Sequence, residues 1–128
     1  MSDWKTPLRL VEQLDKKGNI HEKGVKKLVS AVAEASELGD KLGCAEFIAF
    51  ATSAVRSAPN SEAVLDEVEK QTGVRLQILS GVEEAQLTFL SARRWYGWSA
   101  GRITNLDIGG GSLELSTGTD EHPDLAFS

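Results

Sequence analysis

Residues 105–114 read NLDIGGGSLE: Asp107 lies in an apolar, strand-like segment just before three consecutive glycines, and a second strand-like segment follows them. Glycine has no Cβ, so its backbone can adopt positive φ, and several N–H groups can point into one concavity that suits a phosphate. Asp107 lies where a carboxylate would hold a divalent cation beside that phosphate. The alternative is a tight hairpin turn with a solvated aspartate, because glycine-rich turns are commoner than phosphate sites.

Composition limits the classes of protein to consider. The chain has 128 residues, of which 41% are hydrophobic, enough for one ordinary globular core. A net charge of -5 argues against a general nucleic-acid or anionic-membrane partner, since both require clustered Lys and Arg. No apolar stretch has the length of a membrane span or the position of a signal peptide. The single cysteine, Cys44, is consistent with a reducing compartment, so we expect a soluble, cytoplasmic protein.

Helical and strand-like patterns alternate over residues 19–79. A helix is expected from Asn19, with Asn19 as N-cap and Glu22 in the capping-box position. The apolar run at residues 44–51 predicts a strand buried on both faces in the middle of a sheet. A second helix is expected from about Asn60, followed by a strand at residues 74–79. This order predicts two parallel strands.

A third helix is expected after residue 80. Ser80 and Glu83 have the spacing of a capping box. The expected apolar side of this helix consists of Ala85, Phe89, Ala92 and Tyr96, and the expected solvated charges are Arg93, Arg94 and Arg102. Residues 103–107 and 112–117 then predict a hairpin, followed by a tail that contains proline. This change of pattern predicts a domain boundary near Ala100.

Two adjacent carboxylates lie at the start of the third helix. Helical geometry turns Glu83 and Glu84 about 100° apart, so they are not expected to share one role. Capping explains Glu83. Glu84 either stabilises the helix dipole or acts as a general base toward a water that attacks phosphorus.

Arg56 follows the carboxyl end of the first predicted strand, where open α/β sheets usually bind their ligands. A guanidinium there can hold phosphate oxygens in a bidentate manner, although a surface arginine without a ligand is the commoner outcome. His21 and His122 show no second-ligand pattern, so a zinc site is not expected.

Three blocks in order carry a resemblance to a known family: residues 51–58 (ATSAVRSA), 80–85 (SGVEEA) and 107–114 (DIGGGSLE). Together they resemble the Ppx/GppA phosphatase family of exopolyphosphatases and guanosine pentaphosphate phosphohydrolases. The resemblance implies an α/β fold of the actin, sugar-kinase and Hsp70 ATPase (ribonuclease H-like) type, with two facing domains and the active site in their cleft. Residues 1–100 would be the latter part of the first domain, and residues 101–128 the opening hairpin of the second.

The resemblance also implies roles for individual residues. They are Glu84 as catalytic base, Arg56, Gly109, Gly110, Gly111 and Ser112 as phosphate-binding residues, and Asp107 and Glu114 as metal-associated carboxylates. The implied cofactor is Mg²⁺ or another divalent cation. The implied reaction is metal-assisted attack of water on the terminal phosphate of polyphosphate, with guanosine pentaphosphate (pppGpp) as the alternative substrate.

The sequence also departs from the family pattern. The family's first phosphate loop, of the type Asp-x-Gly-Ser-Asn-Ser, has no counterpart in residues 1–40, and Leu113 stands where threonine is common. We therefore interpret the chain as an internal fragment that is inactive alone and that self-associates, as a homodimer or otherwise, through exposed strand edges.

Two other functions remain open. A non-catalytic phosphate-sensing or interaction module would keep the fold without the chemistry. A nucleotide-dependent kinase or ATPase would share the glycine-rich turn, but would not predict the blocks that contain Arg56 and Glu84.

Overall fold

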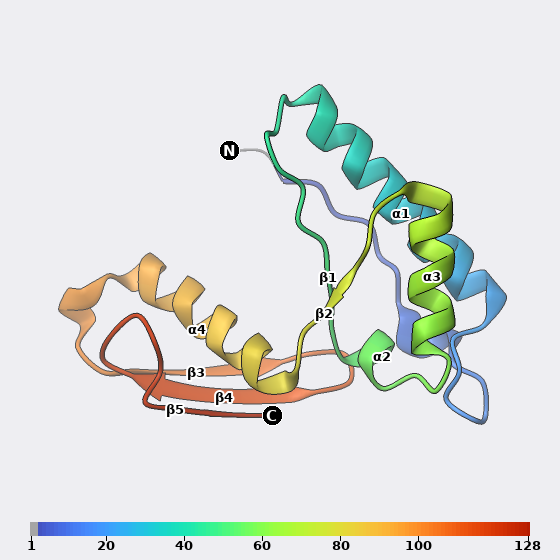
Figure 1. Ribbon diagram of the computed structural model, residues 1–128. Coiled ribbons are helices and arrows are strands. Elements are labelled where there is room, and N and C mark those ends of the chain that lie inside the picture. Colours follow the sequence, from blue (N-terminus) through green and yellow to red (C-terminus); the bar gives the residue numbers. More distant parts are fainter. Residues whose placement is uncertain (1–2) are drawn as a thin grey trace. The chain divides into compact units, whose positions relative to one another are not determined.

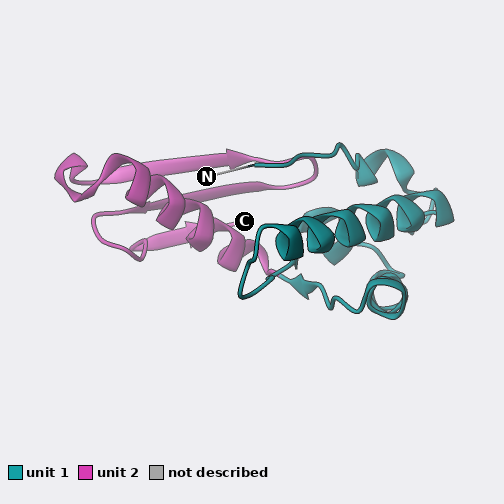
Figure 2. Cartoon of the chain, turned by 90° about the horizontal axis from the view of Figure 1, so that it is seen from above, with its two compact units in different colours: residues 1–78 teal, residues 79–128 magenta. Residues whose placement is uncertain are grey.

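The computed structural model describes residues 3–128, which form two compact α/β units that meet in the chain between Ile78 and Leu79 (Figure 2). Helix α4 (Gly81–Tyr96) belongs to the second unit together with the hairpin. The predicted boundary near Ala100 refers to the domains of the complete fold and stays a prediction. Within residues 3–128, no helix combines the length and the apolar character needed to cross a bilayer.

The first unit contains two parallel strands, with helices before the first strand and between the two strands in the chain (Figure 1). Its elements are η1 (Leu10–Gln13), α1 (Glu22–Lys41), β1 (Phe50–Ala51), α2 (Ser53–Arg56), α3 (Ser61–Thr72) and β2 (Gln77–Ile78). Strand β1 pairs with β2 in parallel, with Phe50 opposite Gln77 and Ala51 opposite Ile78. The predicted parallel pairing is therefore confirmed.

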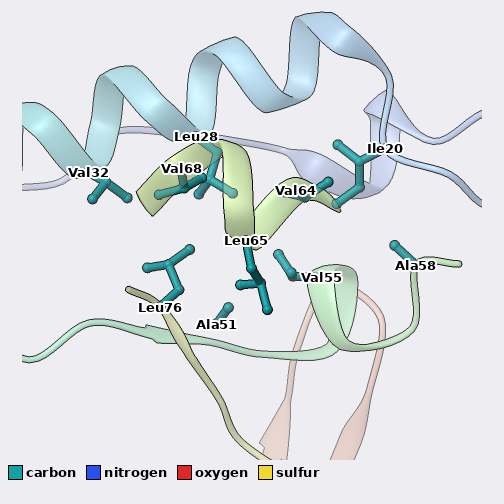
Figure 3. Close-up of a cluster of buried hydrophobic side chains, with 10 residues drawn as sticks. All are labelled: Ile20, Leu28, Val32, Ala51, Val55, Ala58, Val64, Leu65, Val68 and Leu76. Atoms are coloured by element: carbon teal, nitrogen blue, oxygen red, sulfur yellow. The ribbon is translucent and has the colours of Figure 1, made fainter. Parts of the chain in front are cut away.

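The core of the first unit lies around α3. Figure 3 shows Val64 and Val68 pointing toward α1, whereas Leu65 points toward β1 and α2. Residues four apart share a helix face and adjacent residues do not, so one short helix can serve two layers. The buried cluster consists of Ile20, Leu28, Val32, Ala51, Val55, Ala58, Val64, Leu65, Val68 and Leu76.

The strand predicted at residues 44–51 is wrong in its length and burial. Only Phe50 and Ala51 form strand, and the side chains of Phe47 and Ile48 are 41% and 54% exposed. Within residues 3–128, β1 has β2 as its one neighbour, so its other edge lacks ladder hydrogen bonds. Ala51 on one face of β1 is buried, whereas Phe50 on the other face is exposed. Self-association through this exposed apolar segment stays a prediction.

The predicted N-cap at Asn19 is also wrong. Helix α1 begins after His21, without a side-chain cap, while the Asn19 amide donates to the Asp15 carboxylate at 3.1 Å. Hydrogen bonds from the Asn19 side chain and backbone lower the pKa of Asp15. Asn60 precedes α3 but does not cap it, because its side chain accepts from Ile20 N–H at 2.9 Å and donates to Ile20 C=O at 3.0 Å. Asn19 therefore stabilises a local turn, whereas Asn60 joins two segments that are far apart in the sequence.

The second unit is a helix packed on an antiparallel sheet of order β3-β4-β5. After α4 come η2 (Trp98–Ala100), β3 (Ile103–Ile108), β4 (Leu113–Gly118) and β5 (Leu125–Phe127). The predicted hairpin is confirmed, with Asp107 directly opposite Glu114. Strand β5 was not predicted, because its three residues are too few to show an alternating pattern.

The buried side chain of Arg93 joins α4 to the ends of the strands. Its guanidinium donates to four backbone carbonyls: Gly101 and Gly118 at 2.8 Å, Gly97 at 3.2 Å and Asp120 at 3.3 Å. Arg93 is fully buried, with its Cζ 5.6 Å from the Phe89 ring centroid, so the prediction of a solvated charge is wrong.

The predicted apolar side of α4 is correct for Ala85 and Phe89, which are both fully buried, but wrong for Tyr96, which is 67% exposed. Arg93, four residues after Phe89, continues the buried face toward the end of the helix.

We expect Arg93→Met to lower the free energy of unfolding by about 2–4 kcal/mol, because it leaves buried carbonyls without a donor. The matched control is Arg94→Met, which removes an exposed ion pair to Glu121 of 3.1 Å and is expected to change stability by less than about 1 kcal/mol. Denaturant unfolding of both variants measures the difference. Equal stability of the two variants would contradict this role for Arg93.

Candidate active site

The first turn of α4 separates the roles of two neighbouring glutamates. Ser80 N–H donates to the Glu83 carboxylate at 2.8 Å, and Glu83 N–H donates to the Ser80 hydroxyl at 3.2 Å, which confirms the predicted capping box. These hydrogen bonds from Ser80 lower the pKa of Glu83. Glu84 takes no part in the capping box, and its side chain is partly exposed. Of the two carboxylates, Glu84 is therefore the candidate for chemistry.

The glycine turn between β3 and β4 is closed by a hydrogen bond from Gly109 N–H to Ser112 C=O at 3.0 Å. The expectation of positive φ is not met, because the left-handed glycines are Gly18, Gly43, Gly73, Gly97 and Gly101. A Cβ on Gly109 would lie 3.3 Å from Ser112 Oγ, whereas a Cβ on Gly110 would meet no atom within 4 Å. The fold therefore does not itself require a glycine at Gly110, and its exposed backbone can be approached closely by a ligand.

Two carboxylates face each other across the hairpin beside this turn. Asp107 is partly buried, and Glu114 is 1% exposed. One oxygen of Glu114 accepts from Ser128 Oγ at 3.2 Å, while its Oε2 and the Ser112 Oγ are buried without a hydrogen-bond partner among residues 3–128. Like charges directly opposite on a sheet are unfavourable, and buried polar atoms are normally satisfied. Within the described chain, Glu114 Oε2 and Ser112 Oγ therefore lack a partner that a cation or a hydrogen-bond donor could supply.

A hard divalent cation fits the chemistry of these oxygen atoms. No group of three or more His, Cys, Asp or Glu able to hold a metal ion occurs among residues 3–128. Mg²⁺ does not need such a group, because it is usually bound by one or two carboxylates together with water and substrate phosphate. Asp107 and Glu114 supply two carboxylates at one level of the sheet.

A hydrogen bond between α4 and β3 relates Glu84 to this carboxylate pair. Asn105 Nδ2 donates to Thr88 Oγ1 at 3.3 Å. Glu84 lies one helical turn before Thr88, roughly 6 Å along the helix, and Asp107 lies two residues after Asn105, roughly 6.6 Å along the strand. The helix and strand run in opposite directions, so both steps lead to the same end of the second unit, where Figure 1 shows the start of α4 and the β3–β4 turn.

Arg56 is the last residue of α2, immediately after β1, and its side chain is partly exposed. It belongs to the first unit, whereas Glu84, Asp107, Glu114 and the turn all belong to the second. Glu84, Asp107, Glu114 and the glycine turn thus lie at one end of the second unit. Arg56 is part of the other unit.

Sequence reasoning missed Thr88, Asn105 and Ser128 as neighbours of the candidate site. Asn105 shares a strand face with Asp107, since residues two apart on a strand point the same way. That spacing was a usable signal for Asn105. No local pattern indicates that Ser128 contacts Glu114, because β5 pairs with β4 through a poorly patterned tail.

Parallel strands with following helices, then a hairpin with a glycine-rich turn, are parts of the actin-like ATPase fold that solved relatives also show. The chain belongs to the Ppx/GppA phosphatase family, whose family model matches residues 1–128. Proteins named Exopolyphosphatase 1 from Mycobacterium leprae and Mycobacterium tuberculosis are each 59% identical to it over 128 residues, which is all of this chain and 38% and 37% of theirs.

Two solved structures have the same fold. A crystal structure of an exopolyphosphatase from Cytophaga hutchinsonii gives a TM-score of 0.90 at 24% identity, over 99% of this chain and 41% of that one. The Aquifex aeolicus member of the Ppx/GppA family gives 0.80 at 22% identity, over 94% and 39%. The chain thus spans about two fifths of the length of the relatives that it matches.

We expect Gly110→Ala to leave the free energy of unfolding within about 1 kcal/mol of the unmodified protein, because the added methyl enters open space. The matched control is Gly118→Ala, whose Cβ would lie 2.9 Å from Pro123 Cα and is expected to cost about 1–3 kcal/mol. Denaturant unfolding compares the two variants. A Gly110→Ala variant as unstable as Gly118→Ala would show that the fold requires this glycine and would remove the argument for a ligand.

Proposed function

We propose that the full-length protein is an exopolyphosphatase, which uses water to release the terminal phosphate of inorganic polyphosphate. One observation carries the proposal: a glutamate that the helix cap does not use lies at the same end of one unit as an acidic, glycine-rich turn with unpartnered oxygen atoms. Family membership and the names of the mycobacterial relatives support polyphosphate as the substrate.

In the proposed reaction, Glu84 orients a water molecule and accepts its proton as the oxygen attacks the terminal phosphorus. The bond from that phosphorus to the bridging oxygen breaks, and the shortened polyphosphate leaves with the bridging oxygen and its electron pair. The N–H groups of Gly110 and Gly111 and the Ser112 hydroxyl stabilise negative charge on the transferred oxygens. Gly109 N–H closes the turn through its hydrogen bond to Ser112 C=O, so Gly109 contributes the shape of the turn rather than a donor. Arg56 neutralises phosphate charge from the first unit.

Asp107 and Glu114 are the residues that would hold Mg²⁺. When bound there, the ion would neutralise charge on the phosphate oxygens. The support for this assignment is that Glu114 Oε2, which has no hydrogen-bond partner among residues 3–128, lies beside a second carboxylate, so that two hard oxygen ligands are close together. Ser112 contributes a hydroxyl oxygen at the same turn.

We expect Glu84→Gln to lower kcat for polyphosphate hydrolysis by about 10²–10⁴-fold, because the amide cannot accept the proton of the attacking water. The matched control is Glu83→Gln, one residue earlier, since glutamine also serves in a capping box. Released phosphate is measured in the full-length protein with long-chain polyphosphate, tripolyphosphate and pppGpp.

The substrate comparison separates the alternatives. If pppGpp is hydrolysed faster than polyphosphate, pppGpp is the preferred substrate. Binding of polyphosphate without phosphate release by the unmodified protein would favour a phosphate-sensing module. A Glu84→Gln variant as active as the unmodified protein would refute the role of Glu84 as base.

We expect Glu114→Gln to raise the Mg²⁺ concentration needed for half-maximal activity by about tenfold or more, because one of the two proposed carboxylate ligands loses its charge. Chelation of divalent ions should abolish hydrolysis by the unmodified protein, and added Mg²⁺ should restore it. Glu121→Gln, an exposed carboxylate that pairs with Arg94, is the control. Full activity in the presence of a chelator would exclude a divalent cation from the reaction.

A further inference from the structure

We infer that Thr88 and Asn105 are positioning residues that set the separation between Glu84 and Asp107. The inference rests on the proposed function, since it concerns the geometry of the proposed base and the proposed metal-associated carboxylate. Neither residue belongs to the three sequence blocks that resemble the family.

The contact between the two side chains joins the helix to the strand. Asn105 Nδ2 donates to Thr88 Oγ1 at 3.3 Å, and the Thr88 hydroxyl donates to Ala85 C=O at 3.2 Å. The hydroxyl therefore uses its proton within α4 and accepts the amide of β3, which fixes the direction of both groups. Both side chains are partly buried, where competition from water is reduced.

The position of this contact relates it to Glu84. Glu84 and Thr88 are four residues apart and occupy the same side of α4, while Asn105 and Asp107 are two apart and share a face of β3. The hydrogen bond thus lies one helical turn along α4 from Glu84 and two residues along β3 from Asp107. Loss of the bond would free the first turn of α4 to shift along or away from the strand.

The polar character of Thr88 and Asn105 supports a role in fixing the distance and angle between α4 and β3. The neighbours on this side of α4 include Ala85 and Phe89, which are fully buried. Ser116 is directly opposite Asn105, and its buried hydroxyl has no hydrogen-bond partner in the part of the chain that the structure describes. Burial of polar groups is costly unless they are paired, so an apolar pair would pack here at no greater cost. A hydrogen bond adds a defined distance and angle, which an apolar contact does not.

The test compares kcat and KM for polyphosphate in full-length variants. We expect Thr88→Val and Asn105→Leu each to lower kcat by about tenfold to a hundredfold with little change in KM, because small displacements of a base reduce the rate strongly. The double variant should be no slower than the slower single variant, since both remove the same bond. Thr88→Ser keeps the hydroxyl and should retain most of kcat.

The matched control is Thr104→Val. Thr104 precedes Asn105, points to the opposite face of β3 and donates to Thr117 Oγ1 at 3.0 Å. Loss of this hydrogen bond in Thr104→Val should leave kcat unchanged. Unmodified kcat in Thr88→Val, multiplied losses in the double variant, or an equal loss in Thr104→Val would overturn the inference. If Asn105→Leu does not fold, the comparison of kcat between Thr88→Val and Thr88→Ser tests the inference by itself.

Measuring Glu84→Gln in the same assay distinguishes failure of the positioning role from failure of the proposed function. If Glu84→Gln is inactive while Thr88→Val is normal, the positioning role alone fails. If the unmodified protein releases no phosphate, or Glu84→Gln remains fully active, the proposed function and the inference fail together.

Discussion

The second unit depends on the burial of one cation. The hydrogen bonds of the Arg93 guanidinium go to backbone carbonyls, those of residues 97, 101, 118 and 120. Carbonyl dipoles replace the water that the charge loses, so the end of α4, the start of β3 and the end of β4 must converge on a single group. A planar guanidinium suits this task because its donors point in several fixed directions.

Fixing the far end of α4 has a consequence at its start. Helix α4 is joined to the strands at its C-terminal end by Arg93 and near its middle by Thr88, whereas the capping box of Ser80 and Glu83 orders the helix's own first turn. A helix that is joined to a sheet at two levels has little freedom to shift along its axis. The first turn, which carries Glu84, is therefore positioned by contacts that lie farther along the helix.

The sequence predicted the parts of this structure that depend on local rules. The capping box follows from the spacing of Ser80 and Glu83, and the hairpin follows from alternating residues on either side of the glycine turn. The burial of Arg93 could not be predicted, because its partners come from residues up to 27 positions away. The predicted length of β1 was wrong for a related reason, because the extent of a strand depends on neighbouring strands that its own sequence does not reveal.

The candidate site was predicted from residue types, but its geometry depends on register. Only antiparallel pairing that sets Asp107 opposite Glu114 brings two carboxylates to one level, and a slip of one residue would turn one of them to the other face. The register is fixed by the turn and by packing against α4, so the fold itself holds two like charges together. That arrangement, with Glu114 buried and one of its oxygens unpartnered, costs stability unless a ligand completes it. A locally unfavourable feature that the surrounding packing maintains is typical of a binding site, which is the physical reason to locate chemistry at this end of the hairpin.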